Sequence, residues 1–237
     1  DTIVFDFDGT LADTMKSSLI AFESTLLQFH FERPKPLTED IYGAFSIEGL
    51  FRYIGMSDLD LQSKMMFRYN ELYREIAPRI ASLFPGVRFT LKRVKDRGLG
   101  LAIATNEVRE NLDMRLATFG SDHIFDTTCC ADEVSRPKPW PDMVRKVVSR
   151  LDADPTQSLM LGDSVCDIEM ARNSHMESCA VSWGATPFDC LLDASPNLAI
   201  TNFLQLLDIL GIENTNPKFH NIFFSKPTGI SETSLAC

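Results

Sequence analysis

The chain has 237 residues, which exceeds the usual size of one domain without requiring two complete ones. Hydrophobic residues make up 44% of it, and the formal net charge of -10 argues against a nucleic-acid-binding or anionic-membrane surface. No apolar run is long enough to span a membrane, and six cysteines without a CxxC pair argue against a zinc site or a disulfide scaffold. We therefore expect a cytoplasmic globular protein, preceded by a short segment because the chain begins at Asp1 rather than Met.

The first apolar stretch ends in two carboxylates one residue apart. Residues 3–5 are Ile-Val-Phe, and Asp6, Asp8 and Gly9 follow. A continuous apolar run is typical of a strand buried on both faces of a sheet, and ligands bind beyond the carboxyl ends of such strands. Two carboxylates that close repel each other unless a cation or a shared proton relieves them. The stretch indicates a hard metal ion held by oxygen ligands, with one carboxylate available as a nucleophile.

The next part of the chain is predicted to be entirely helical. Residues 15–29 have the apolar spacing of an amphipathic helix, and Arg33-Pro34-Lys35-Pro36 ends it. The pattern stays helical from residue 38 to residue 77, where Pro78 is expected to close the last helix. No strand is expected between residues 15 and 83, so this segment reads as an all-helical insertion.

Strands and helices alternate from residue 84 onward. This alternation predicts an α/β fold, with a Rossmann-like parallel sheet and helices on both faces. The expected core comprises residues 1–14 and 84–210, and residues 211–237 form a polar tail. The expected strands cover residues 99–105, 124–130, 158–161, 179–183 and 198–201, and the expected helices cover residues 87–97, 107–119, 141–151, 165–173, 188–192 and a segment ending at 210.

Polar residues follow several of these strands. Thr105 and Asn106 end one strand, and Asp163 ends another, with Asp167 one helical turn further on. Lys138 lies between two prolines. Taken singly, Lys138 would be a solvated loop lysine, and Asp167 could be a helix N-terminal carboxylate favoured by the macrodipole.

Together these residues have the chemistry that phosphoryl transfer needs. Its transition state spreads negative charge over three oxygens of the transferred group. A carboxylate can attack phosphorus, a divalent ion such as Mg2+ can neutralise charge, and hydroxyl, ammonium and backbone N–H groups can bind the remaining oxygens. In such a site Asp6 would attack, Asp163 would complete the metal site and Asp167 would hold a metal-bound water. Asp8 would give a proton to the leaving group and later activate water.

These motifs resemble those of the haloacid-dehalogenase superfamily of phosphatases, in the subgroup whose helical cap is inserted soon after the first motif. The resemblance covers roughly residues 1–210 and keeps the family's order. The motifs are Asp6-Phe7-Asp8-Gly9-Thr10, then Thr105, then Lys138, then Gly162-Asp163 with Asp167.

The resemblance implies a role for each of these residues. Asp6 would be the nucleophile and Asp8 the general acid/base. Mg2+ would be bound by Asp6, the backbone carbonyl of Asp8 and Asp163. Phosphate would be bound by Thr105 and Lys138, with Asn106 and the backbone around Phe7 and Asp8. Residues 15–83 would be a mobile cap that closes over the substrate.

The resemblance leaves several reactions to compare. The dehalogenase branch of the family lacks the second acid that Asp8 would supply, so Asp8 favours a phosphatase over a dehalogenase. Relatives of β-phosphoglucomutase carry a His and an Arg where this chain has Ser18 and Ile47, and no lysine fits the phosphonatase pattern. Thr105-Asn106 and residues 84–86 resemble the phosphoglycolate-phosphatase-like branch most closely.

We therefore predict a Mg2+-dependent phosphatase for a small, anionic phosphorylated metabolite, acting as a monomer or homodimer. A phosphomutase, a pyrophosphatase and a phospho-ligand- or partner-binding protein with little turnover are the alternatives. Specificity is expected to lie in the cap, at the glycine-bounded loop over residues 43–49 with Ser46, and at Arg52.

Overall fold

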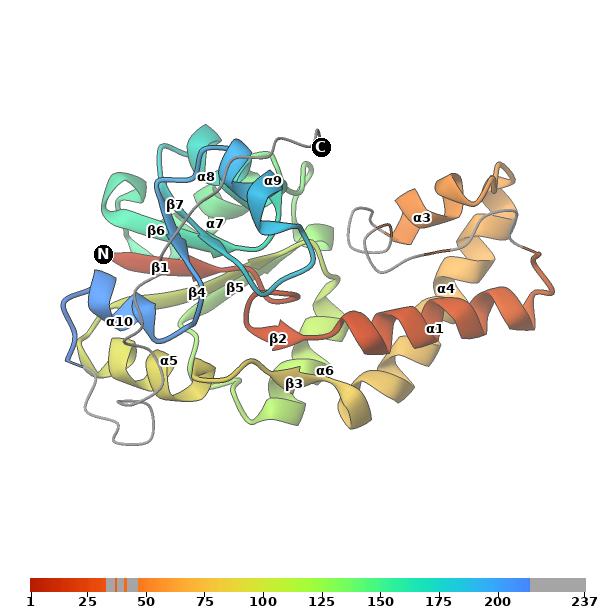
Figure 1. Ribbon diagram of the computed structural model, residues 1–237, viewed down its shortest axis with the longest axis horizontal. Helices are drawn as coiled ribbons and strands as arrows, with labels where there is room; N and C mark the ends of the chain where they lie inside the picture. Colours follow the sequence, from red (N-terminus) through yellow and green to blue (C-terminus); the bar gives the residue numbers. More distant parts are fainter. Residues whose placement is uncertain (33–36, 38–40, 42–46, 214–237) are drawn as a thin grey trace, which may run out of the picture.

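The computed structural model describes residues 1–32, 37, 41 and 47–213, and its main feature is a six-stranded sheet (Figure 1). The strands are β1 (Thr2–Phe5), β4 (Gly100–Thr105), β5 (Thr127–Cys130), β6 (Ser158–Gly162), β7 (Glu177–Val181) and β8 (Leu198–Ile200). Their order is β5-β4-β1-β6-β7-β8, and every adjacent pair is parallel.

Strand β1 lies in the middle of this sheet. Phe5 pairs with Ile103 of β4 on one side and with Leu161 of β6 on the other. All four residues of β1 are buried, which explains the apolar run Ile-Val-Phe over residues 3–5 that follows Thr2. The chain builds β4 and β5 on one side of β1 and then crosses to β6 on the other. The carboxyl end of β1 is therefore at the point where the strand order reverses, which is where ligands bind in open α/β sheets.

Helices cover both faces of the sheet. One core cluster joins it to α5 (Val87–Asp96), α6 (Arg109–Phe119) and α10 (Gln205–Ile209). Two further clusters join it to α7 (Asp142–Leu151), α8 (Val165–Asn173) and α9 (Phe188–Asp193). The predicted Rossmann-like α/β class is confirmed. No helix in the described part of the chain has both the length and the apolar character needed to cross a membrane.

A separate helical unit extends from one end of the sheet (Figure 1). It contains α1 (Met15–Gln28), α3 (Ile47–Tyr53) and α4 (Leu59–Ile80), and it has a hydrophobic core of its own. In that core the rings of Phe22 and Phe51 lie 5.0 Å apart. Separate cores indicate that the helical unit and the sheet are stabilised largely independently.

Two expectations for this region are wrong. Helix α4 does not end at Pro78 but continues to Ile80. A proline removes only one backbone hydrogen bond, and the Ala81 N–H still donates to Ala77 O at 2.9 Å. A short strand also occurs where none was expected: β3 (Ser82–Leu83) pairs antiparallel with β2 (Ala12–Asp13). Two-residue strands are too short to show alternation in the sequence. This ribbon joins the two connections between the helical unit and the sheet.

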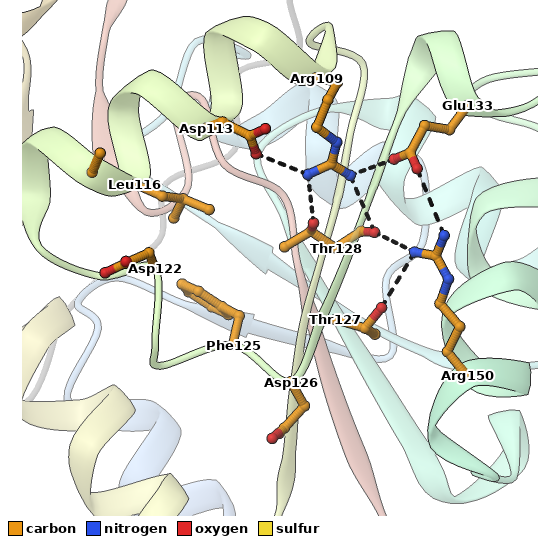
Figure 2. A pocket seen from close by; sticks show the side chains of 11 residues that line it. Arg109, Asp113, Leu116, Asp122, Phe125, Asp126, Thr127, Thr128, Glu133 and Arg150 are labelled. Carbon is orange, nitrogen blue, oxygen red and sulfur yellow. Dashed lines mark hydrogen bonds and ion pairs between the residues drawn. The ribbon is translucent and has the colours of Figure 1, made fainter.

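The outer edge of strand β5 is covered by two arginines (Figure 2). Arg109 and Arg150 both donate to the carbonyl oxygen of Thr128, at 3.3 and 2.7 Å, and Glu133 pairs with both. A cavity of about 550 Å³ lies beside them, between β5 and α6. Charged side chains that occupy an edge carbonyl hinder pairing with another strand, so we interpret this region as protection of the sheet edge.

Candidate active site

The two carboxylates of the opening motif lie directly beyond β1. The Asp6 N–H still donates to Leu161 O at 2.9 Å, so its position is set by the sheet. Gly9 has a φ of 74°, a left-handed conformation that favours glycine and turns the chain away. Asp6 is buried, whereas Asp8 is half-buried.

Three aspartates and one lysine form a buried cluster at this point. Oxygens of Asp6, Asp163 and Asp167 lie within 4.8 Å of one another. Lys138 Nζ donates to Asp6 Oδ1 at 2.7 Å and to Asp167 Oδ1 at 2.6 Å. Asp6 and Asp167 belong to this one cluster although they are 161 positions apart in the sequence.

The cluster has more negative than positive charge. Burial raises the pKa of Asp6 well above its ordinary value, although Lys138 acts to lower it. Burial, with Asp167 nearby, raises the pKa of Asp163 to about 6. Burial alone would lower the pKa of Lys138, but Asp167 and Asp6 raise it above its ordinary value. One ammonium does not balance three carboxylates, and a divalent cation fits the remaining charge and the hard oxygen ligands.

Hydrogen bonds fix the carboxylates contributed by β6 and α8. Asp163 accepts from Thr10 Oγ1 at 2.9 Å and from the Ala185 N–H at 2.8 Å. Asp167 Oδ2 accepts from the Ser164 N–H at 3.1 Å, which helps to cap helix α8, and from Ser164 Oγ at 2.6 Å. Asp167 Oδ1 binds Lys138. Asp167 is therefore both a helix-capping carboxylate and a member of the cluster.

Three glycines make room for these carboxylates. A Cβ on Gly9 would lie 2.1 Å from Asp163 Oδ2, and one on Gly184 would lie 2.1 Å from Asp163 Cβ. A Cβ on Gly162 would lie 2.2 Å from Asp167 Cγ. Real Cβ atoms do not approach other atoms so closely, so any side chain at these positions would displace the acidic cluster.

We expect Gly162→Ala to reduce turnover about tenfold or more, because the new methyl group must push the Asp167 carboxylate away from Lys138. The Mg2+ concentration that gives half-maximal activity should rise as well. Gly120→Ala is the control, since a Cβ there has open space although its φ of 57° is strained. If Gly162→Ala matched wild type in turnover and in Mg2+ requirement, the cluster would not need this geometry.

Thr105 and Asn106 lie at the carboxyl end of β4, beside β1. Thr105 is buried, and its Oγ1 accepts from the Glu107 N–H at 3.1 Å. Asn106 Oδ1 accepts from the Lys138 backbone N–H at 3.1 Å. Asn106 therefore holds the loop that delivers Lys138.

Of the two residues expected to set specificity, one lies outside the described part of the chain and the other lies on the helical unit. Ser46 lies outside the described residues, as does most of the loop over 43–49. Arg52 is exposed on α3 of the helical unit. Ser18 pairs through its hydroxyl with Tyr69 at 2.6 Å, inside the same unit.

Arg115 and Glu107 are site residues that the sequence analysis missed. Arg115 forms an ion pair with Asp8 Oδ1 and a second one with Glu107 Oε2 at 2.7 Å. Thr14 Oγ1 donates to the same Asp8 oxygen at 2.5 Å. An arginine inside a helix reads as a solvated residue, and only the fold brings it to the opening motif.

The aspartates thus lie at the carboxyl edge of the central strand of a parallel α/β sheet, and the helical unit is inserted between β1 and β4 of that sheet. A family model for the haloacid dehalogenase-like hydrolases matches residues 3–181. The chain belongs to this family.

Individual relatives agree with this assignment. The chain is 28% identical over 221 residues to "Pyrophosphatase PpaX" of Bacillus pumilus, covering 90% of this chain and 97% of that protein. It is 32% identical over 211 residues to "Probable phosphatase IndB" of Dickeya dadantii, covering 86% and 91%. The fold is similar to the crystal structure of a predicted phosphoglycolate phosphatase from Haemophilus somnus, with a TM-score of 0.77, 22% identity and coverage of 88% and 97%. The prediction of a phosphatase of the haloacid-dehalogenase type is confirmed at the level of enzyme class.

Proposed function

We propose that this protein is a Mg2+-dependent phosphatase that hydrolyses a small, anionic phosphomonoester through an aspartyl-phosphate intermediate. The observation that carries the proposal is the buried cluster in which Lys138 binds Asp6 beside Asp163 and Asp167. Mg2+ would be held by Asp6 and Asp163 with the backbone carbonyl of Asp8, and Asp167 would hold a metal-bound water. When bound, the metal would neutralise charge as the phosphate approaches.

The residues would act in two steps. In the first, a carboxylate oxygen of Asp6 attacks phosphorus, the ester P–O bond breaks, and Asp8 gives its proton to the leaving oxygen. In the second, Asp8 takes a proton from water, which attacks the phosphorus of the aspartyl phosphate and releases phosphate and Asp6. Lys138, the Thr105 hydroxyl, Asn106 and the backbone N–H groups around Phe7 would bind the phosphate oxygens.

The helical unit would act as the cap of this enzyme. In this proposal residues 1–14 and 84–210 form the catalytic core, and residues 15–83 close over the substrate, with Ser46 and Arg52 contributing to specificity. The paired strands β2 and β3, through which the chain leaves and re-enters the core, support a hinge there. The tail over 211–237 has no role in the proposal, and residues 214–237 lie outside the described structure. The five described cysteines are free, which supports a cytoplasmic setting.

The relatives favour one second candidate, a pyrophosphatase, because several of them carry that name. Phosphate release would be measured for p-nitrophenyl phosphate, a panel of phosphorylated metabolites and pyrophosphate, with Mg2+ and with EDTA. We expect Mg2+-dependent release that is fastest for one class of phosphomonoester and stops in EDTA. Fastest release from pyrophosphate would favour the second candidate, and no release from any compound would contradict the proposal.

We expect Mg2+ to raise the melting temperature at about pH 7.5, and this increment to disappear below about pH 6. The pKa of Asp163 is raised to about 6 in the folded metal-free protein. The folded state thus holds this proton more tightly than the unfolded chain, so the metal-free protein gains stability as the pH falls through 6, whereas Mg2+ needs the ionised carboxylate. Differential scanning calorimetry at several pH values measures both effects. An equal increment at about pH 7.5 and 5 would contradict this assignment.

A further inference from the structure

Arg115 is a buried cation that the proposed mechanism does not use. Arg115 and Lys138 are the two buried cations in the described part of the chain, and Arg115 is only 2% exposed. Its guanidinium forms a fork between Asp8 Oδ1 and Glu107 Oε2. The Arg115 Nε–H has no hydrogen-bond partner among the described residues. Burying a charge with one donor unpaired is costly, which argues that this arginine serves more than stability.

The guanidinium also lies between two aromatic rings from different parts of the molecule. Its central carbon is 4.5 Å from the ring centroid of Tyr73 and 5.6 Å from that of Phe7. Phe7 separates the two motif aspartates, whereas Tyr73 belongs to helix α4 of the helical unit. Aromatic faces attract a guanidinium, and more strongly where water is excluded.

Polar contacts join the same two helices beside this arginine. On α6, Asn111 donates to Asn70 of α4 at 3.3 Å and to Glu107 Oε1 at 2.9 Å. Arg74 of α4 forms an ion pair with Glu110 at 2.6 Å. Helix α4 therefore contacts α6 next to the group that binds Asp8.

We propose that Arg115 is a positioning residue, which couples the seating of helix α4 on the core to the orientation of the Asp8 carboxylate. The proposal rests on the proposed function, in which Asp8 transfers protons. Arg115 and Thr14 both donate to Oδ1 of Asp8, so Oδ2 is left as the oxygen that exchanges a proton with the leaving group. When α4 is seated, Tyr73 covers the guanidinium and keeps water away from its pair with Asp8. When α4 moves away, Arg115 loses that cover and Asp8 loses its fixed orientation.

The test uses the dependence of kcat/KM on the leaving group. An alkyl phosphate needs a proton on its leaving oxygen, whereas p-nitrophenyl phosphate releases p-nitrophenolate, a stable anion that needs no proton to leave. The main variant combines Arg115→Gln with Glu107→Gln, so that no buried carboxylate is left unpaired at position 107. It is compared with Glu107→Gln alone. Arg115→Lys keeps the charge but not the planar fork.

We expect Arg115→Gln to lower kcat/KM for the alkyl ester about tenfold to a hundredfold more than for p-nitrophenyl phosphate, and Arg115→Lys to recover part of this loss. Equal losses on both esters, or no loss, would overturn the proposal. Circular dichroism and thermal unfolding establish that each variant is folded. Absence of Mg2+-dependent release by the wild-type enzyme would instead contradict the proposed function, and it is measured first.

Variants of Tyr73 test the coupling of Arg115 to the helical unit. They also test the proposal if the double variant does not fold. Tyr73→Phe keeps the ring over Arg115, and Tyr73→Leu replaces the ring by a smaller aliphatic side chain. We expect Tyr73→Leu to lose more kcat/KM on the alkyl ester than on p-nitrophenyl phosphate. We expect Tyr73→Phe to keep the wild-type dependence of kcat/KM on the leaving group. If both variants had the wild-type dependence, α4 would not act on Asp8 through Arg115.

Discussion

Asp6→Asn should abolish turnover, by about 10⁴-fold or more, while the protein stays folded. An amide oxygen is a poor nucleophile, and loss of a catalytic nucleophile removes most of the rate enhancement of an enzyme. The fold should tolerate the change well. Burial raises the pKa of Asp6 well above its ordinary value, because charge on that carboxylate is costly in the folded metal-free protein. Lys138 also keeps Asp167 as a partner at 2.6 Å when Asp6 loses its charge.

The comparison variant for Asp6→Asn is Asp193→Asn, which makes the same chemical change at an exposed position. Phosphate release with Mg2+ gives the activity, and thermal unfolding in EDTA gives the stability. We expect Asp193→Asn to match wild type in both. Substantial phosphatase activity in folded Asp6→Asn would show that another group attacks phosphorus.

Lys138→Met should both lower activity, by about 10²- to 10³-fold, and destabilise the metal-free protein by about 3–5 kcal/mol. The loss of activity follows because the change removes an ammonium that binds Asp6 and, in the proposed mechanism, the phosphate. The loss of stability follows because Asp6, Asp163 and Asp167 would stay buried without a cationic partner among the described residues. Mg2+ should restore part of the stability, since it supplies positive charge to the same carboxylates.

Urea unfolding with EDTA and with Mg2+ measures this difference in the free energy of unfolding. Lys146→Met is the control, because Lys146 is partly exposed and its Nζ binds the Glu133 carbonyl oxygen at 3.0 Å, away from the acidic cluster. We expect Mg2+ to stabilise Lys138→Met more than it stabilises Lys146→Met. Equal stability of the two variants in EDTA would mean that Lys138 does not hold the carboxylates together.

Much of the core was predictable because its signals are local. Three of the four buried residues of β1 appear in the sequence as a continuous apolar run, and helix α8 was expected with the bounds that it has. Strands β4 and β6 deviate by one residue at one end. Since parallel strands end at the same edge of the sheet, polar residues after them could be expected to meet there, and Asp6, Lys138, Asp163 and Asp167 do so.

Features that depend on distant contacts were not predictable. The pairing of β2 with β3 joins residues that are about seventy positions apart and leaves no periodic pattern. Arg115 gives no signal because its ion pair with Asp8 spans 107 positions and arises only when α6 packs against the sheet. Pro78 indicated the end of a helix, but packing of Tyr73 and Ala77 in the core of the helical unit favours continuation.

The central claim is that Asp6 becomes phosphorylated during turnover, and trapping tests it most directly. Enzyme that is turning over a phosphomonoester with Mg2+ is quenched in acid and reduced with borohydride, which converts a phosphorylated aspartate into homoserine. Asp8→Asn, which lacks the carboxylate proposed to activate water, should accumulate more of the intermediate from p-nitrophenyl phosphate, whose leaving group needs no proton. Peptide mass spectrometry should find homoserine at position 6 and unmodified aspartate at 163 and 167. Rapid phosphate release without homoserine at position 6 would contradict the account.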